Sequence, residues 1–260
     1  MKDTAFYVIK CITNLHVGSG ETSFGVVDNL VQRDVNTQLP TIHSSSIKGA
    51  LREFFQNNNT EVLPIFGDEK NAGKWQFLSA DLLSRPLRSS KSPYFNATST
   101  SVVKSLIQKL TNFGLPVPND LLSLSFQSPE KGHPIVFSDE YRGAIIEELD
   151  WVIKDDSQIQ NITLLPWVNA AFGENLALLH PDDFQSLELP VIARNHLENG
   201  KSENLWYEEV VPYDSRFATF IIQSPEMRDT FEKGLEDMVQ IGANASIGYG
   251  LCKFFIPNRP

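Results

Sequence analysis

The chain has 260 residues, of which 41% are hydrophobic and 21% are charged, as is typical of a globular protein long enough to bury a sizeable core. Its formal net charge of −10 argues against binding nucleic acid over the whole surface. The longest apolar runs are too short to span a bilayer and Met1–Thr4 is not an apolar signal segment, so we expect a cytoplasmic protein with no membrane partner.

The charge is unevenly distributed along the chain. Residues 1–52 hold five Lys/Arg and four Asp/Glu, whereas the other 208 residues hold 17 and 28. Any anion-binding site must therefore be a local patch on an acidic body. The two cysteines, Cys11 and Cys252, lie in apolar, strand-like surroundings, which predicts two buried reduced thiols rather than a disulfide framework.

The first third of the chain contains strand and helix patterns separated by a glycine loop. Residues 5–13 read as a strand, 16–20 form a Gly-containing loop and 25–33 are extended. A helix follows at 46–56, and a further strand is predicted at 74–79. From about 85 to 200 the pattern is irregular, with possible short helices at 100–111 and 180–187.

Regular patterns return in the last quarter of the chain. Residues 205–211 and 216–223 read as strands, a helix is predicted at 225–238, and the glycine-rich segment 242–250 leads into a last strand at 251–256. The glycines of 242–250 precede a strand instead of opening a helix, so they predict a tight turn and not a dinucleotide site.

Without the irregular middle, the element order is strand, helix, strand, strand, helix, strand. This order predicts an α+β fold of the ferredoxin-like or RRM-like type, with a long insertion within about 85–200. The first and last strands are neighbours in that plan, so Cys11 and Cys252 are expected to lie close together without being bonded. The fold alone does not establish RNA binding.

Serines and two cations meet at the start of the helix at 46–56. The helix is expected to begin near Ser45 or Ser46, since serine is a preferred N-cap residue. Lys48 and Arg52 lie one turn apart, away from the apolar stripe that begins at Ile47. Hydroxyls, free N–H groups and cations suit a phosphate. A capped surface helix with solvated Lys and Arg explains the same pattern.

One acid stands out in the segment 25–33. Asp28 is flanked by valines and leucines, and a carboxylate is costly to bury there unless it is paired or lies at the surface of a site. It is either a structural Asp held by Arg33 or by a turn, or a metal ligand or proton acceptor beside a bound phosphate. The spacing of the five histidines predicts no zinc site.

Several short motifs occur in a fixed order along the chain. They are His16–Gly20, Gly25–Asp34, Leu39-Pro40, Ser45–Arg52, Ile65–Gly67, Leu205–Glu209 and the glycine-rich loop near the C-terminus. This ordered set resembles the RAMP superfamily and, more narrowly, the repeated backbone subunit of type III-B (Cmr) CRISPR effector complexes. The type III-A (Csm) backbone subunit shares the first motifs but not the LWYEE segment.

The resemblance implies a single RAMP domain over residues 1–260, with an RRM-like palm and a thumb-like insertion. Copies would stack into a filament along a CRISPR guide RNA, together with other Cmr-complex subunits, in antiviral defence. The complex would cut a complementary single-stranded target RNA at regular intervals as an endoribonuclease that uses a divalent cation, Mg²⁺ or Mn²⁺. Guide pairing would read the sequence, while the protein reads backbone and shape.

The resemblance also assigns roles to residues of this chain. Asp28 matches the family's catalytic Asp and is a possible metal ligand, and His16 matches a position near it. Glu208 and Glu209 are candidate second carboxylates. The segment that grips the guide backbone matches Ser45, Ser46, Lys48 and Arg52, and Arg33 is expected to pair with Asp28 or to touch phosphate.

One departure from the family pattern concerns the residues before these serines. Relatives usually carry Pro-Gly where this chain has His43-Ser44. Glycine lets a backbone approach RNA closely, so a serine side chain either crowds that contact or replaces it with a hydroxyl.

Two other functions fit the residues. One is a non-catalytic RNA-binding scaffold of a type III CRISPR complex, which a cleavage assay would separate from the nuclease. The other is an enzyme on a ferredoxin-like fold that acts on a small phosphate-bearing substrate, which co-purifying RNA would argue against.

Overall fold

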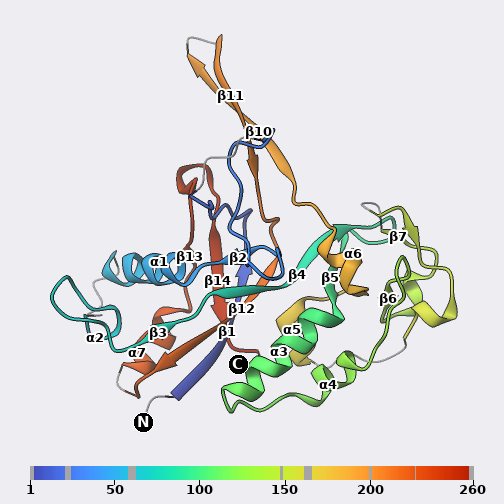
Figure 1. The fold of residues 1–260 in the computed structure, drawn as a ribbon, viewed down its shortest axis with the longest axis horizontal. Coiled ribbons are helices and arrows are strands. Elements are labelled where there is room, and N and C mark those ends of the chain that lie inside the picture. Colours follow the sequence, from blue (N-terminus) through green and yellow to red (C-terminus); the bar gives the residue numbers. More distant parts are fainter. Residues whose placement is uncertain are drawn as a thin grey trace.

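The computed structural model of the chain describes residues 3–20, 25–57, 63–146, 149–160, 166–198, 201–225 and 227–257 (Figure 1). None of the helices in these ranges combines the length and apolar character that crossing a bilayer requires.

A ten-stranded mixed sheet runs through the molecule. Its neighbouring strands pair antiparallel except for β5 and β9, which run parallel. In spatial order the strands are β13 (Val239–Gln240), β14 (Leu251–Phe255), β1 (Asp3–Cys11), β12 (Arg216–Gln223), β4 (Ala80–Arg88), β5 (Tyr94–Ser99), β9 (Leu176–Leu179) and β6 (Ile135–Val136), with β2 (Thr41–Ile42) on β4 and β3 (Gln76–Phe77) on β12.

Helices and smaller strands complete the structure. Two further pairs of strands lie outside the large sheet, and one of these pairs is described below as a projecting hairpin. The helices are α1 (Ser44–Asn57), α2 (Leu63–Phe66), α3 (Thr100–Asn112), α4 (Asn119–Ser125), α5 (Pro166–Phe172), α6 (Pro181–Gln185) and α7 (Arg228–Gly234), and the second small sheet is β7 (Ile145–Ile146) with β8 (Trp151–Val152).

The half of the sheet around β1 gives the α+β arrangement that the sequence predicts. Along the chain, α1 lies between β1 and β4, and α7 lies between β12 and β14. β1 pairs with β12 on one edge and with β14 on the other, so the first and last strands are neighbours, as predicted. Cys11 lies opposite Cys252, and both thiols are free and buried. A hydrogen bond with Cys252, together with burial, raises the pKa of the Cys11 thiol.

Two predicted elements have the wrong extent. The strand at 74–79 is reduced to β3, and β4 starts only at Ala80. The helix at 225–238 is reduced to α7, which ends at Gly234, and Met238, the last residue of the predicted helix, is 52% exposed. The chain must leave the helix early because Val239 and Gln240 pair with β14.

Residues 85–200 are irregular in sequence but contain regular structure. β4 runs on to Arg88, and β5, β9 and β6 widen the sheet. α3 confirms the helix predicted at 100–111, and α6 lies within the one predicted at 180–187. The strand β9 has four residues, all buried, so it shows neither the alternation nor the length that would identify a strand in the sequence.

A two-stranded hairpin projects away from the sheet, as Figure 1 shows. It consists of β10 (Val191–Glu198) and β11 (Lys201–Glu209), which pair antiparallel. The sequence counts the strand at 205–211 among the strands of the predicted sheet. That placement is wrong, because β11 pairs with β10 and stays outside the large sheet.

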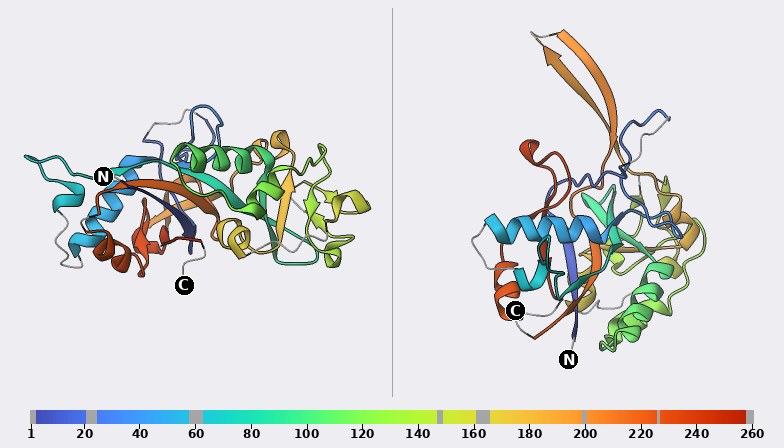
Figure 2. Two further views of the ribbon diagram at one scale, coloured as in Figure 1. Left: turned by 90° about the horizontal axis from the view of Figure 1, so that it is seen from below. Right: turned by 60° about the vertical axis from the view of Figure 1, so that its left-hand side comes forward.

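Helices cover both faces of the sheet (Figure 2). On one face α1 buries Ile47, Leu51 and Phe55, which confirms the predicted apolar stripe, and Phe55 stacks on Phe231 of α7 with ring centroids 5.1 Å apart. Gly234 is required for this packing, since a Cβ atom at that position would lie 2.2 Å from the Phe55 ring. On the other face Trp167 of α5 stacks on Phe6 of β1.

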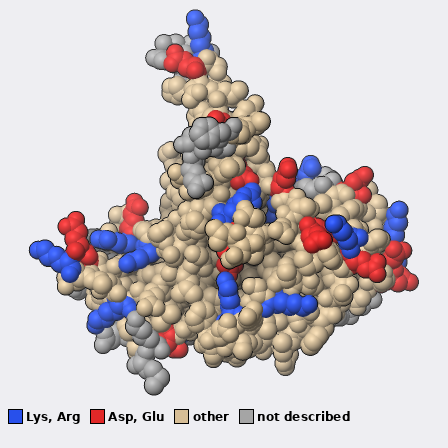
Figure 3. Space-filling model, viewed as in Figure 1, with Lys and Arg blue, Asp and Glu red and all other residues tan. Residues whose placement is uncertain are grey.

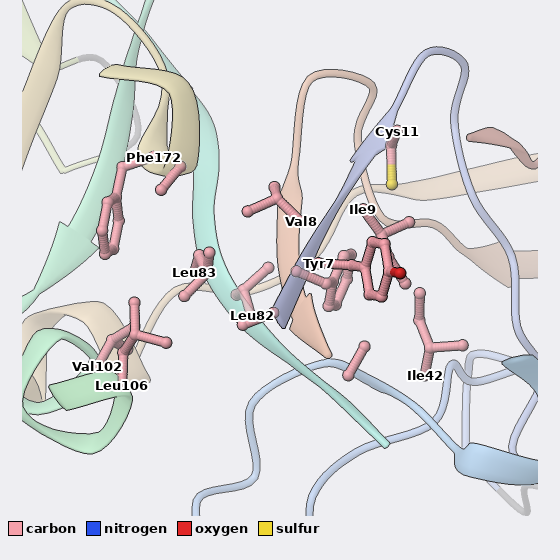
Figure 4. Packing of buried hydrophobic residues seen from close by; sticks show 14 of the residues in the cluster. Tyr7, Val8, Ile9, Cys11, Ile42, Leu82, Leu83, Val102, Leu106 and Phe172 are labelled. Carbon is pink, nitrogen blue, oxygen red and sulfur yellow. The ribbon is translucent and has the colours of Figure 1, made fainter. Parts of the chain in front are cut away.

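The buried core follows the sheet from β1 across β4 (Figure 4). Tyr7 and Ile9 of β1 lie near Ile42, while Leu83 of β4 points toward the side chains that α3 contributes, among them Leu106. The two halves of the sheet therefore share one continuous apolar cluster, which fixes the strands that carry the loops described next.

Candidate functional site

Asp28 lies on the surface at the foot of β11, where it is tied to Tyr207. The backbone N–H groups of Asp28 and Asn29 donate to the Tyr207 carbonyl oxygen at 3.0 and 3.1 Å. The Tyr207 N–H in turn donates to Asp28 Oδ2 at 2.7 Å. Within the described ranges Asp28 Oδ1 accepts no hydrogen bond. One carboxylate oxygen therefore holds the hairpin, and the other is open to a ligand.

The segment around Asp28 is not a buried strand. Val26 is 84% exposed and Leu30 is 37% exposed, whereas Val31 is buried. The segment makes isolated bridges to its neighbours, of which Asn29–Glu208 is parallel and Gly18–Val31 antiparallel. The cost of burying a carboxylate therefore does not arise at Asp28, because its apolar neighbours are exposed with it.

Arg33 pairs with Glu209 rather than with Asp28, which corrects one of its two predicted roles. Arg33 Nη2 donates to Glu209 Oε1, and Arg33 Nη1 donates to the Gln38 carbonyl at 3.0 Å. The second oxygen of Glu209 accepts from the Val31 N–H at 3.1 Å. Glu209 is buried with both carboxylate oxygens engaged, so it organises the segment 29–33.

His16 is buried between the two glutamates. Its Nδ1 lies 2.7 Å from the Glu209 carbonyl oxygen, and because a carbonyl only accepts, Nδ1 carries the proton of this bond. Its Nε2 lies 3.7 Å from Glu208 Oε1. A Cβ atom at Gly18 would come within 3.3 Å of Nε2, so the small residue at position 18 leaves room for the ring. His16 is thus fixed in one orientation, facing Glu208.

Glu208 is held by the glycine-rich loop and by β10. Asn244 Nδ2 lies 2.9 Å from both carboxylate oxygens, and Arg194 Nε lies 3.1 Å from Oε2. The Arg194 guanidinium covers the Tyr249 ring, 4.6 Å from its centroid. Glu208 and Glu209 are 4% and 6% exposed, so neither predicted second carboxylate is open in the way that Asp28 is.

The glycines of the loop 242–250 have the predicted turn role. Gly242 and Gly250 have φ values of 78° and 77°, which favour glycine. A Cβ atom at Gly242 would lie 2.3 Å from the His16 carbonyl oxygen, which accepts from the Ala243 N–H at 2.9 Å. The loop therefore lies directly against the segment after β1 that carries His16.

The start of α1 presents the predicted hydroxyls and cations. The helix begins at Ser44, slightly before the predicted start, and the His43 carbonyl accepts the first helical bond from the Ile47 N–H. Ser45 and Arg52 are exposed and Lys48 is half-buried. Lys48 forms no ion pair with any residue that the structure describes. Figure 3 shows Lys and Arg side chains over α1 and near the base of the hairpin.

The backbone N–H groups of His43 and Ser44 both donate hydrogen bonds to other residues of the protein. The His43 N–H donates to Gln32 Oε1 at 2.7 Å, and the Ser44 N–H donates to the Ser79 hydroxyl at 3.1 Å. The two residues that replace Pro-Gly thus anchor the helix start. The predicted anion-binding groups that stay accessible on this helix are Ser45, Lys48 and Arg52.

Gln32 joins the loop 16–20 to α1, and the sequence pattern does not identify it. Its Nε2 donates to the Gly18 carbonyl at 3.3 Å and to the Ser46 hydroxyl at 3.1 Å, while its Oε1 accepts from His43. Gln32 is 8% exposed. Through this side chain the His16 loop, the Asp28 segment and the helix start form one connected surface.

No group of three or more His, Cys, Asp or Glu side chains among the described residues is placed to hold a metal ion. Asp28 offers one open carboxylate oxygen. Mg²⁺ is often held by one or two carboxylates together with substrate phosphates, so Asp28 fits a cation that nucleic acid helps to bind. It does not fit a cation caged by protein alone.

A second buried polar cluster lies at the start of β12, on the face of β1 opposite Ile9. Lys10 Nζ lies 2.8 Å from Asp214 Oδ1, and Arg216 Nη1 lies 3.2 Å from Asp214 Oδ2. The Tyr94 hydroxyl donates to the same oxygen at 3.0 Å. Burial raises the pKa of Asp214, but the Lys10 hydrogen bond and the charges of Arg216 and Lys10 outweigh it, so the pKa is lowered.

The fold and this arrangement belong to a known class of proteins. The family model of the RAMP superfamily matches residues 8–253, so the chain belongs to that superfamily, as the order of its motifs predicts.

Its similarity extends to named relatives over nearly the full length. The chain is 28% identical over 277 residues to the CRISPR system Cmr endoribonuclease Cmr4 of Pyrococcus furiosus, covering 93% of this chain and 92% of the relative. It is 29% identical over 170 residues to the CRISPR system CMR subunit Cmr4 of Saccharolobus solfataricus, covering 60% and 54% of the two chains.

Solved structures agree with the fold. A chain of the apo state of type III-B Cmr-beta superposes with a TM-score of 0.80 at 24% identity, covering 97% of this chain and 96% of the other. Oligomeric Cmr4 from Pyrococcus furiosus superposes with a TM-score of 0.69 at 26% identity, covering 98% and 97%. These likenesses cover the added half of the sheet and the projecting hairpin as well as the α+β half.

Proposed function

We propose that this protein is the backbone subunit of a type III-B CRISPR effector, and that it binds guide RNA and cuts complementary target RNA as an endoribonuclease. The observation that carries the proposal is Asp28, an exposed carboxylate with one open oxygen, fixed at the foot of a projecting hairpin. Membership of the RAMP superfamily and the likeness to a relative named an endoribonuclease support it.

The helix start of α1 would hold the guide RNA backbone. The exposed Ser45 hydroxyl and the Lys48 and Arg52 cations lie on one helix, away from its buried stripe. A phosphate needs such donors and charges, and contacts of this kind fix position without reading sequence. Ser46 is less available, because its hydroxyl already accepts a hydrogen bond from Gln32.

The hairpin would act as the thumb, and the α+β half of the sheet as the RRM-like palm, of a single RAMP domain. The hairpin stands clear of the sheet, and its strand β11 is exposed from Lys201 to Leu205. Inserted beside a guide–target duplex, it would displace a target nucleotide next to Asp28. Displacement supplies the in-line geometry that a stacked strand denies.

Asp28 would accept the proton of the target 2′-hydroxyl at Oδ1. The hydroxyl oxygen bonds to the adjacent 3′-phosphate while the bond to the 5′-oxygen of the next nucleotide breaks, and that oxygen takes a proton from water. Asp28 and the RNA phosphates would also hold a divalent cation, Mg²⁺ or Mn²⁺. When bound, this cation offsets negative charge on the phosphate.

His16, Glu208 and Glu209 would support the site from inside. His16 faces Glu208, and both glutamates are occupied by protein donors. We assign them to holding the hairpin and the Asp28 segment rather than to proton transfer with RNA. Arg33, which has a partly exposed guanidinium paired with Glu209, would touch phosphate from the same segment.

Copies of the chain would stack along the guide in a filament with other Cmr-complex subunits in the cytoplasm. A relative from Pyrococcus furiosus is described as oligomeric, and a Cmr-beta complex bound to cognate target RNA has the same fold at 22% identity. A non-catalytic scaffold is the second candidate. The hydrogen bond from the Tyr207 N–H favours it, since that bond alone gives Asp28 a structural use.

The test is cleavage of a labelled guide-complementary RNA by the reconstituted complex with Mg²⁺, comparing the native chain with Asp28→Asn. Asparagine keeps an oxygen for the Tyr207 N–H but cannot take the proton. Regularly spaced cuts lost only in the variant, with target binding kept, support the nuclease. Cuts that persist in the variant contradict the role of Asp28, and binding without cuts in both chains leaves the scaffold.

A further inference from the structure

The hairpin is held at its base by two loops that lie on different sides of it. A two-stranded hairpin is at best marginally stable alone, so contacts at its base determine its orientation relative to the sheet. On one side the segment 25–33 holds it through the Asp28–Tyr207 hydrogen bonds. On the other side the loop 242–250 holds it through Asn244 and Tyr249.

Arg194 of β10 is the residue that connects the second loop to the hairpin. It lies opposite Trp206 in the hairpin register, one residue from the pair Ala193–Tyr207. Its guanidinium covers the Tyr249 ring at 4.6 Å, and its Nε lies 3.1 Å from Glu208 Oε2. Its Nη2 is buried and has no hydrogen-bond partner within the described part of the chain. The contacts with Tyr249 and Glu208 therefore hold the guanidinium plane in one orientation.

Arg194 is connected to Asp28 through Glu208 and its neighbours in β11. Glu208, which Arg194 holds, forms a parallel bridge with Asn29, the neighbour of Asp28. The Tyr207 N–H that holds Asp28 belongs to the residue before Glu208. A change in the tilt of the hairpin on the loop 242–250 therefore moves the donor that orients the Asp28 carboxylate.

We propose that Arg194 is a positioning residue: by stacking on Tyr249 and pairing with Glu208 it fixes the tilt of the hairpin and so the place of the Asp28 carboxylate. This inference rests on the proposed function for its effect on cutting. Its structural part, the coupling of Tyr249 to the Asp28–Tyr207 contact, stands without RNA.

The planar guanidinium is suited to both contacts at once. It stacks on an aromatic face and still donates in its own plane to a carboxylate. Lysine would pair with Glu208 but would not keep the stacked plane. An ordinary structural ion pair predicts that Arg194→Lys behaves like the native chain, whereas a positioning role predicts a loss.

The first test is amide hydrogen exchange of the isolated chain, read at the amides of Asp28, Asn29 and Tyr207. Arg194→Ala and Tyr249→Leu are expected to speed exchange at these amides about tenfold, a size consistent with one cation–π contact and its ion pair. Tyr249→Phe keeps the ring and should retain most of the protection. Ile247→Ala, on the same loop but away from Arg194, is the matched control.

The second test is single-turnover cutting by the reconstituted complex. Arg194→Ala and Tyr249→Leu are expected to lower the rate constant about tenfold with target Kd unchanged, with Arg194→Lys in between and Tyr249→Phe close to native. Native exchange at the three amides in Arg194→Ala overturns the inference, whether or not the complex cuts. A native complex that binds but does not cut contradicts the proposed function alone, because the exchange result still decides the coupling.

Discussion

The two buried polar clusters of this protein are alike in chemistry and different in surroundings. At the foot of the hairpin Glu208 and Glu209 are held by Arg194 and Arg33, and at the start of β12 Asp214 is held by Lys10 and Arg216. The first cluster adjoins Asp28, an exposed acid that the hairpin holds through the Tyr207 N–H, whereas Glu174, an exposed acid near the second cluster, lies away from the hairpin. Buried ion pairs beside an exposed acid therefore do not mark the candidate site by themselves, and the attachment of the acid to the hairpin distinguishes it.

The largest effect is expected from removing one acid from each cluster. Glu208→Ala and Asp214→Ala each leave cations without their acid, which typically costs about 3–5 kcal/mol of unfolding free energy when the pair is buried. Urea unfolding of the isolated chain measures this. Glu208→Ala should also speed amide exchange at Tyr207 beyond the global effect, and Asp214→Ala should not. Faster local exchange in Asp214→Ala would remove the distinction between the clusters.

The second prediction uses the lowered pKa of Asp214. Because its folded pKa lies below its unfolded value, the carboxylate contributes stability that is present above the ordinary Asp pKa of about 3.9 and is lost as the pH falls through the folded pKa. Asp214→Asn should flatten the loss of stability at acid pH relative to the native chain. Unfolding free energies measured from neutral pH downward give the difference. Parallel curves would contradict the role of Asp214.

A smaller effect is expected at Gln32, which joins the loop 16–20 to the start of α1. Gln32→Ala removes the acceptor of a part-buried hydrogen bond from the His43 N–H, at a cost of about 1 kcal/mol. Amide exchange at His43 and Ile47 should become faster, because the helix start loses its anchor. Gln32→Glu keeps an acceptor for His43 and is the matched variant. Equal exchange in the Ala and Glu variants would show that the anchor lies elsewhere.

The smallest effect is expected at Lys48, where charge and not packing is removed. Lys48→Ala should weaken guide RNA binding and reduce the salt slope of log K by about one unit, since one phosphate contact is lost. Guide RNA titrations at several salt concentrations measure the slope. Lys104→Ala removes an exposed lysine of α3 as the control. An unchanged slope in Lys48→Ala would assign guide phosphates to other residues.

The sequence predicts the α+β half of the fold because its patterns are local. The stripe on α1, the strand β1 and the turn glycines of 242–250 each depend on neighbouring residues alone. The sequence does not predict the half formed by β5, β9 and β6. The four-residue strand β9 is recognisable only through its pairing with β5, about 80 residues earlier in the chain. No short stretch of sequence specifies the register between strands that are distant in the chain.

For the candidate site, the order of the motifs groups residues that the structure also brings together, but it does not give their pairings. Motif order brings Asp28, His16 and Glu208 together, and the structure places all three at the foot of the hairpin. The predicted pairing of Arg33 with Asp28 is wrong. Whether Arg33 meets Asp28 or Glu209 depends on how the segment 25–33 crosses β11. Arg194 and Gln32 have no sequence signal, since their importance comes from contacts across more than ten residues.

The position of β1 in the sheet has a consequence for synthesis of the chain. Its two neighbours, β12 and β14, begin at Arg216 and Leu251, so one edge of β1 lacks its partner until β12 has been made and the other until β14 has been made. Until then an apolar nascent strand, Ala5–Ile9, offers unpaired backbone groups to any other chain. Productive folding of the α+β half therefore waits until β14 has been made, and overproduction at high rate should favour inclusion bodies.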